Sequence, residues 1–387
     1  MAKLTKFTSL GVLQNFSVPC LIEFLTRFKA YLKARKVKLS AETFEYEQVI
    51  SLFTQVDSDT PQELLEAAFF IEEMATRSGR AKVIKEAKAR KIILGYDSED
   101  LSVHDFILIT WLRHPDLLEA AKSRVLTWRK RSFCTCPPTR GEVHPLVRSE
   151  IGSVSALEQG LADVLPGCDS GSVKVIEYDD VESDELWWLI RRTDFLERVP
   201  VMGASGNPEV VFVRPLKYDV IVYDKLHGEL RINTDKSLHG EYRQEFGQFL
   251  FGRQDYFAER DVYSLDVLFD NDPAFLDCSG IAGIDAIRWT EVGFAFPGSF
   301  GITRVDRSPD MVRSKRLKGK PFVPPGVAIR YAKFDVFFEG AKSPRSVQVM
   351  SGNIANYSRE ADSSALDYWL RHSGIMITLM QQVAHAA

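Results

Sequence analysis

Apolar residues recur at three- and four-residue steps along the first 131 residues, which is the spacing of amphipathic helices. Between Pro19 and Ala34 the apolar stripe consists of Leu21, Phe24, Leu25, Phe28, Tyr31 and Leu32. The same spacing predicts further helices at Phe44–Phe53, Glu63–Met74, Arg80–Lys91, Ser102–Arg113 and Pro115–Arg131. The pattern therefore predicts an all-α helical bundle over residues 1–131.

Two of these helices have the layout of a helix-turn-helix unit. Thr60-Pro61 is a helix-start signal, with threonine as N-cap and proline at the first helical position. A short turn containing Gly79 then separates Glu63–Met74 from Arg80–Lys91. The helical region is therefore expected to contain a helix-turn-helix-like pair.

The helical pattern stops at residue 132. Pro137, Pro138, Gly141 and Pro145 lie close together, and no apolar periodicity spans residues 132–151. We expect this segment to be a linker between two domains.

Beyond residue 152 the pattern changes to short runs typical of β-strands. The expected strands are Val173–Tyr178, Glu185–Arg191, Val210–Arg214, Asp219–Tyr223, Glu229–Asn233, Ile284–Phe296, Val327–Phe338 and Ser346–Met350. Helical spacing interrupts them at Ser155–Val164, Ser237–Phe251 and Arg359–His372. The predicted fold class is thus α+β multidomain, an N-terminal all-α helical bundle followed by a mainly antiparallel α+β domain over 152–387. If that region divides in two, the seam is expected near 271–283.

The composition is that of an ordinary folded chain. Of 387 residues, 45% are hydrophobic and 26% charged, which excludes a wholly disordered chain and a collagen-like fibre. There is no signal-peptide core and no apolar run of about 18 residues, so we expect a cytoplasmic protein without a membrane partner. The five cysteines are scattered, as in a reducing compartment. Cys134 and Cys136 lack a second ligand pair at metal-binding spacing and are expected to be loop thiols without a metal.

Positive charge is concentrated in the helical region. The whole chain has a net charge of −4, whereas residues 1–132 hold 21 Lys+Arg against 17 Asp+Glu. Arg27–Lys38 contains six basic residues and no acid, and the glycine and proline content of 304–320 predicts a basic extended loop. The candidate nucleic-acid-binding residues are Arg80, Lys82, Lys85, Lys88, Lys91, Arg129, Lys130, Arg131, Arg313, Lys315, Arg316 and Lys318. Such residues contact the phosphates of DNA or RNA, although solvated helix faces and loops carry the same residues.

One predicted hairpin is similar to the metal core of restriction-type nucleases. Those cores place an aspartate on one strand and Glu-x-Lys on the next, and the two acids hold Mg²⁺. Here Asp219 matches the first acid and Glu229-Leu-Arg231 the second element, with arginine, a poor base, in place of lysine. Asp219, Glu229 and Arg231 are therefore an alternative catalytic set, and Mg²⁺ is expected only under that alternative. An ordinary hairpin with polar residues facing outward is the competing interpretation.

The remaining motifs point away from a defined reaction. The sequence holds no P-loop, no dinucleotide-binding fingerprint and no G-x-S-x-G elbow. Trp187 and Trp188 are adjacent, so on a strand one is expected in the core and the other at a protein interface. The leading hypothesis is a non-catalytic nucleic-acid-associated or regulatory protein without a cofactor. The alternatives are a protein–protein adaptor or assembly subunit and a divergent metal-dependent nuclease.

Overall fold

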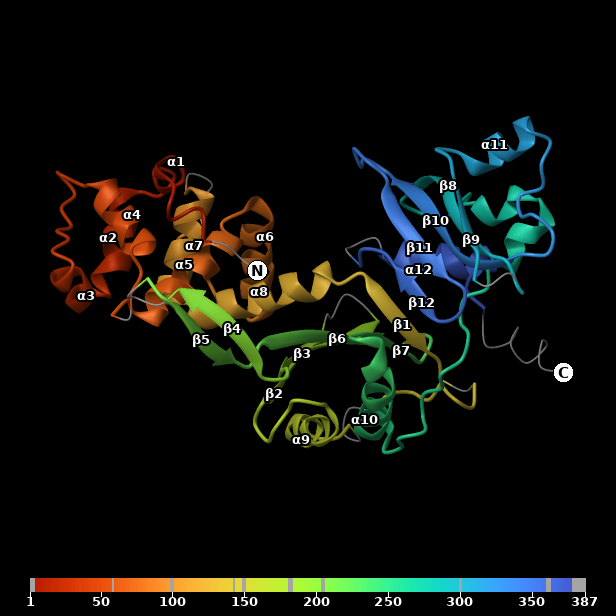
Figure 1. Ribbon diagram of the computed structural model, residues 1–387, viewed down its shortest axis with the longest axis horizontal. Helices are drawn as coiled ribbons and strands as arrows, with labels where there is room; N and C mark the ends of the chain where they lie inside the picture. Colours follow the sequence, from red (N-terminus) through yellow and green to blue (C-terminus); the bar gives the residue numbers. More distant parts are fainter. Residues whose placement is uncertain are drawn as a thin grey trace. The chain divides into compact units, whose positions relative to one another are not determined.

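The computed structural model forms two compact units, which are described separately (Figure 1). Unit 1 comprises Met1–Leu126 and Val199–Val211, and unit 2 comprises Thr127–Arg198 and Phe212–Ala387. The structure describes residues 4–57, 59–97, 101–141, 143–147, 151–179, 184–202, 206–298, 301–359 and 363–377. Among these residues no helix combines the length and apolar character needed to cross a bilayer.

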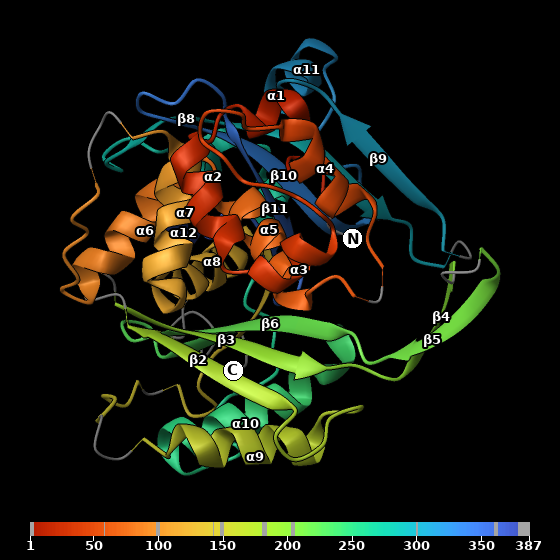
Figure 2. The same ribbon diagram turned by 90° about the vertical axis from the view of Figure 1, so that its left-hand side faces the viewer.

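Residues Met1–Leu126 of unit 1 form helices (Figure 2), and these helices surround one apolar core. The helices are α1 (Leu10–Leu13), α2 (Val18–Thr26), α3 (Lys29–Ala34), α4 (Tyr46–Thr54), α5 (Gln62–Met74), α6 (Arg77–Ala89), α7 (Val103–Arg113) and α8 (Pro115–Arg129), whose last turn belongs to unit 2. Helix α7 packs against α2, α5 and α6, and its residues Phe106, Ile107 and Leu108 are fully buried. The helix expected over Pro19–Ala34 is broken at Arg27-Phe28, because Phe28 leaves the helical conformation at φ −107° and ψ 35°.

The turn between α5 and α6 differs from the expected one. Helix α6 begins at Arg77, so the connection is Ala75-Thr76, and the Thr76 side chain accepts a hydrogen bond from the Gly79 amide as N-cap. Gly79 lies inside the first helical turn. A Cβ at this position would lie 2.1 Å from the Met74 carbonyl oxygen, so glycine is required here for close approach.

Unit 2 contains a ten-stranded sheet in the order β2-β3-β6-β7-β1-β12-β11-β10-β8-β9. Its strands are β1 (Ser132–Cys136), β2 (Val173–Asp179), β3 (Glu185–Thr193), β6 (Leu216–Asp224), β7 (Glu229–Asn233), β8 (Ile284–Ala295), β9 (Thr303–Arg307), β10 (Ala328–Phe338), β11 (Arg345–Met350) and β12 (Ile354–Asn356). Every neighbouring pair is antiparallel. The α+β multidomain fold with a mainly antiparallel sheet is thus confirmed.

The start of the expected linker is the central strand of this sheet. Ser132–Cys136 forms β1, which pairs with β7 through Cys134↔Ile232 and with β12 through Cys134↔Ile354. The expectation of a linker from residue 132 is therefore wrong for these five residues. Their neighbours on both sides come from far along the chain, so no local pattern marks them as a strand.

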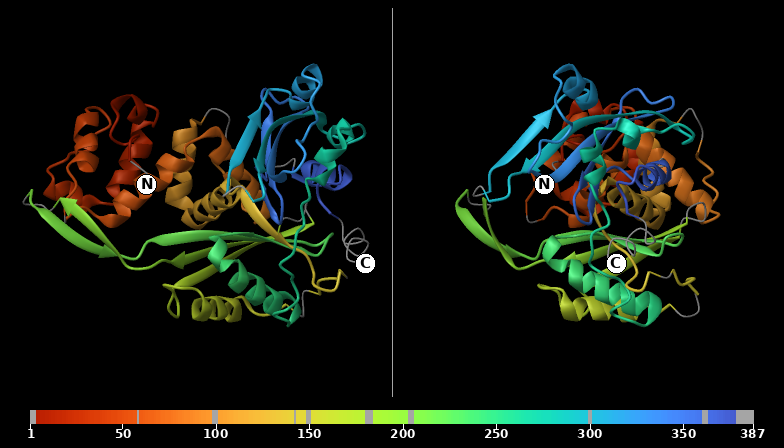
Figure 3. Two further views of the ribbon diagram at one scale, coloured as in Figure 1. Left: turned by 45° about the vertical axis from the view of Figure 1, so that its right-hand side comes forward. Right: turned by 90° about the vertical axis from the view of Figure 1, so that its right-hand side faces the viewer.

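Each half of the sheet has its own helical cover. Helices α9 (Val154–Val164) and α10 (His239–Phe251) lie side by side along one face of β2, β3, β6 and β7 (Figure 3). Helix α10 ends at Gly252, whose φ of 66° is the left-handed C-cap conformation. The other half packs with η2 (Asp266–Asp270), η3 (Pro273–Leu276), α11 (Met311–Leu317) and α12 (Ser363–His372) around a core that includes Trp289 and Trp369.

A separate two-stranded ribbon extends the β3–β6 pair. It consists of β4 (Glu197–Met202) and β5 (Pro208–Val213), and the Asp194 amide donates a hydrogen bond to the Pro215 carbonyl at its base. Every residue of β5 is exposed. Among the described residues no third strand pairs with the ribbon.

Candidate functional site

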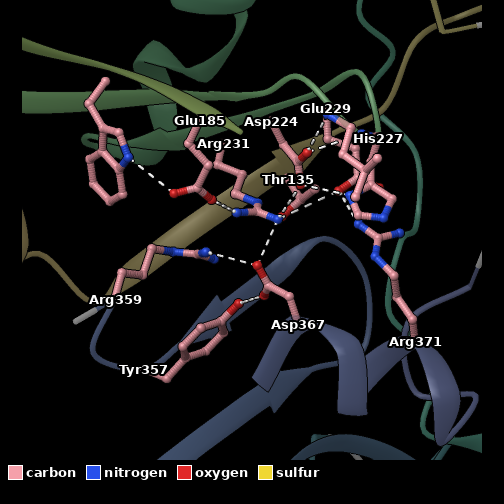
Figure 4. A network of polar contacts seen from close by, with 12 residues as sticks. Thr135, Glu185, Asp224, His227, Glu229, Arg231, Tyr357, Arg359, Asp367 and Arg371 are labelled. Carbon is pink, nitrogen blue, oxygen red and sulfur yellow. Dashed lines mark hydrogen bonds and ion pairs between the residues drawn. The ribbon is translucent and has the colours of Figure 1, made fainter. Parts of the chain in front are cut away.

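A buried network of charged side chains joins the two halves of unit 2 (Figure 4). At its centre, Arg231 on β7 is fully buried. Its guanidinium donates to Glu185 on β3 at 2.5 Å and to Asp224 on β6 at 2.9 Å. It also forms an ion pair with Asp367 on α12 at 2.9 Å. One arginine thus connects its hairpin partner β6 with β3 and with α12, which are distant in the sequence.

The outer members of the network are also paired. Arg371 donates to Glu229 at 2.6 Å, and the Tyr357 hydroxyl donates to Asp367. The Arg359 guanidinium lies over the rings of Phe133 and Tyr357, with its central carbon 4.8 and 4.5 Å from the ring centroids. These contacts satisfy most of the charge internally and hold α12 against β7.

The network controls the ionisation of its own carboxylates. Although burial opposes ionisation, the hydrogen bond from His227 and the charge of Arg231 hold the pKa of Asp224 well below its ordinary value. Burial likewise opposes the ionisation of Asp367, but Arg231 and Arg359 lower its pKa. Both groups are therefore carboxylates at neutral pH, held by arginine.

The structure does not bring together the residues of the nuclease alternative. In the β6–β7 pair, Asp224 lies opposite Glu229 and Val220 lies opposite Asn233, so Asp219 and Glu229 belong to opposite ends of the hairpin. Asp219 accepts hydrogen bonds from Arg192 at 2.6 Å and from Tyr242 at 2.7 Å. Among the described residues no group of three His, Cys, Asp or Glu side chains is arranged to hold a metal ion.

Cys134 and Cys136 are not loop thiols, because both lie on β1 and are buried. Their sulfur atoms are 3.9 Å apart. The hydrogen bond between them, opposed by burial and reinforced by His239, lowers the pKa of Cys134 to about 6. The same hydrogen bond, together with burial, raises the pKa of Cys136, and both thiols have almost no exposed surface.

A cleft of about 780 Å³ lies in unit 2 beside this part of the sheet. Its charged lining residues are Lys236, Glu259, Arg260, Asp261, Arg304 and Arg330. The volume is that of small-molecule sites, and the cations outnumber the acids. The cleft therefore fits a polar or anionic small molecule better than an apolar one.

Glu291 contacts Tyr331, a residue that lines the cleft, and it makes the stability of this region depend on pH. It accepts hydrogen bonds from Arg307 at 2.5 Å and Tyr331 at 2.8 Å, and pairs with Lys333 at 3.0 Å. Against the effect of burial, these three partners lower the pKa of Glu291 from 4.5 to about 2. Its carboxylate therefore stabilises the fold above pH 4.5, and that contribution disappears as the pH falls through about 2.

Replacing Glu291 with glutamine is expected to lower the free energy of unfolding at pH 7 by about 1–2 kcal/mol. The difference from wild type should shrink steadily between pH 4.5 and 2, as the wild-type carboxylate becomes protonated. Urea unfolding at several pH values measures this difference. Exposed Glu339→Gln is the matched control and should show no such trend. A constant difference across the pH range would contradict the assignment.

The predicted basic residues of α6 differ in exposure and in their contacts. Arg80 is occupied, because it donates to the Leu101 carbonyl and to Asp97, both at 3.0 Å. Lys82 is half-buried, whereas Lys85 and Lys88 are exposed. Lys91 lies beyond the end of the helix with a left-handed φ of 57°, so the expected helical boundary at this residue is wrong.

The remaining predicted basic residues differ in exposure. Lys130 is half-buried and Arg131 is exposed, while the Arg129 side chain lies outside the described residues. The extended loop expected over 304–320 is instead β9 followed by α11, because the Asp310 side chain caps the helix by accepting from the Arg313 amide. On α11, Lys315 is buried and bonds to Asp306 at 2.6 Å, and the exposed cations are Arg313, Arg316 and, at its C-cap, Lys318.

Both tryptophans of the predicted pair are buried within unit 2. Trp187 and Trp188 point to opposite faces of β3 as expected, but they are only 6% and 1% exposed. Trp188 packs against Phe246 and Phe249 of α10, and Trp187 belongs to a second apolar cluster with Phe133. The expectation of one exposed indole is therefore wrong, because both faces of β3 are buried.

Unit 1 contains a basic groove. In the sequence it was visible only as the run of basic residues in Arg27–Lys38. It has a volume of about 460 Å³ and lies where α2, α3 and the segment after α3 meet. Lys29, Lys33, Lys36 and Lys38 line it, around an apolar floor that includes Leu32, Val37 and Leu39. All four lysines are exposed, and none pairs with an acid among the described residues. We call this surface the lysine groove.

The end of α3 creates the lysine groove. Lys36 takes a left-handed φ of 56°, and the Val37 amide donates to the Leu32 carbonyl at 2.9 Å, as in a Schellman motif. The chain therefore turns back, which brings Lys36 and Lys38 beside the helical lysines. Lys29 and Lys33 lie one turn apart on the same helix face, where like charges repel. An anion bound between them would relieve that repulsion.

No protein-family model matches the chain, and a search of curated proteins gave no match either.

Proposed function

We propose that this protein is a non-catalytic nucleic-acid-associated protein that contacts phosphates through the lysine groove of its helical unit. The main support for this proposal is that four exposed lysines line one concave surface. None of the four pairs with an acid in the described residues. The net charge of the chain is −4, so attraction to a polyanion must come from a local surface of this kind.

The chemistry of the groove suits phosphates more than base edges. Lysine is a compact point charge, whereas base recognition uses forked donors such as arginine, asparagine and glutamine. The nearby Arg35 is already paired with Asp57 at 2.5 Å. Lys29 and Lys33 are separated by about 6 Å along the helix axis. This is close to the axial rise over two nucleotide steps of one duplex strand, which is about 7 Å. The expected binding is therefore independent of base sequence.

Fluorescence anisotropy with labelled single- and double-stranded DNA and RNA tests the proposal. Four phosphate contacts give a slope of about −3.6 for log affinity against log salt on duplex DNA, or roughly a 100-fold loss between 50 and 200 mM salt. Lys33→Glu with Lys36→Glu should abolish at least two contacts, reducing the slope by about 2 and weakening binding at 50 mM salt.

Two comparison variants make the result specific. Lys320→Glu with Lys342→Glu changes the net charge equally at exposed sites in unit 2 and should leave the salt slope unchanged. Lys85→Glu with Lys88→Glu tests α6, whose lysines do not line the groove. Absence of binding to all four nucleic acids at 50 mM salt, or binding that the groove variant leaves intact, would contradict the proposal. An acidic protein partner would then be the better ligand class for the groove.

A further inference from the structure

The ribbon formed by β4 and β5 exposes an unusual amount of apolar surface. Its large apolar side chains and those at its base are 36–73% exposed: Phe195, Leu196, Val201, Met202, Val210, Val211, Phe212, Val213 and Leu216. Isolated exposed apolar residues are ordinary, but a contiguous group of this size marks an interaction site. An isolated two-stranded ribbon is also only marginally stable in water without further packing. Both facts indicate that something covers this ribbon.

The two strands differ in their ability to accept another strand. Pro200 lies in the middle of β4 and has no amide hydrogen, which blunts that edge against strand pairing. In β5, proline occupies only the first position, and Glu209–Val213 retains every backbone donor and acceptor. Four of these five residues are apolar and one is charged. The open edge is therefore that of β5.

The sequence of β5 is complementary to itself. In an antiparallel pairing of two copies centred on Val211, Val210 of one copy lies opposite Phe212 of the other, on the same face. Glu209 then lies opposite Val213, so no like charges meet across the pair. A two-fold axis through Val211 would thus place Val211 beside its own counterpart and Val210 beside Phe212 of the other copy.

The exposed area matches what a dimer needs. At about 150–200 Å² for each large apolar residue, these exposures leave roughly 700–900 Å² of surface, spread over the two faces of one ribbon. A stable interface of standard size buries about 800 Å² per partner. A second copy of the same ribbon supplies an equal surface and the missing strand.

We propose that the chain forms a two-fold symmetric dimer in which the β5 strands of two copies pair antiparallel, giving a four-stranded ribbon centred on Val211. The main-chain hydrogen bonds of the two edges provide register, and the apolar side chains at and near the ribbon provide affinity. This dimer is independent of nucleic-acid binding, since the lysine groove shares no residue with the ribbon.

Sedimentation equilibrium of the full-length chain tests the dimer. The wild type should sediment at twice the 43.8 kDa chain mass at micromolar concentration. Val211→Lys should weaken dimerisation at least ~30-fold, as for a central interface residue. The matched control is Val305→Lys, because Val305 is 49% exposed on the edge strand β9. This control should leave the dimer intact.

A cysteine variant tests the register. Val211→Cys places two thiols opposite each other across the two-fold axis, so mild oxidation should give a reducible covalent dimer, and Val305→Cys should not. A monomeric wild type at tens of micromolar would overturn the proposal, and a different protein would then be the expected partner of the ribbon. A dimer that Val211→Lys does not weaken would also overturn it, as would an open-ended assembly.

Discussion

Replacing Arg231 with alanine is expected to lower the free energy of unfolding of unit 2 by about 3–5 kcal/mol. The arginine is fully buried and is shared by Glu185, Asp224 and Asp367. Without it, the three carboxylates lose a shared cation, and burial then opposes the ionisation of Asp224 and Asp367. Part of the loss should be recovered on lowering the pH to about 5, because protonation removes the unpaired charge.

Chemical unfolding followed by tryptophan fluorescence measures the effect. The control is Arg214→Ala, which removes an ion pair with Asp169 whose members are 48% and 68% exposed. Solvent screens that pair, so its loss should cost less than about 1 kcal/mol. Equal costs for the two variants would show that the buried network is not what joins the halves of unit 2.

Replacing Trp369 with alanine is expected to cost a further large amount, about 3–5 kcal/mol. Trp369 is fully buried on α12, packs edge-on against Phe334 at 5.1 Å and donates its indole hydrogen to the Phe275 carbonyl at 3.0 Å. Its removal leaves a cavity and an unsatisfied carbonyl. It also loosens the helix that presents Asp367 to Arg231.

The neighbouring residue provides the control for this variant. Tyr368 is on the same helix but 58% exposed, and its ring stacks on His372. Tyr368→Ala should change stability by no more than about 0.5 kcal/mol. Thermal unfolding of both variants checks the contrast. If Trp369→Ala matched Tyr368→Ala, α12 would not be docked through its indole.

Much of the fold follows from local spacing. The helices α4, α5, α7, α9 and α10 lie where apolar periodicity placed them, within a few residues. Their positions are readable because each depends on contacts between residues three or four apart. Helix α6 begins three residues before the expected Arg80, because the role of Gly79 depends on the Met74 carbonyl, which a residue count does not reveal.

The candidate sites depended much less on local pattern. The Arg27–Lys38 charge run was visible in the sequence, but the groove exists only because the left-handed Lys36 turns the chain back on α3. Asp219 and Glu229 fitted a metal motif by spacing, yet the β6–β7 register places them at opposite ends of a hairpin. Spacing along a strand fixes the face of a side chain, but not its partner on other elements.

The sequence by itself therefore determined the division into a helical region and an antiparallel α+β region, because the 3.6- and 2-residue periods are properties of the local backbone. Only the tertiary structure decided that Ser132–Cys136 is the central strand and that Arg231 meets Asp367 from α12. These contacts join residues that are roughly a hundred or more positions apart. They arise when the ten strands assemble into one sheet, and no period along the chain encodes which distant strands become neighbours.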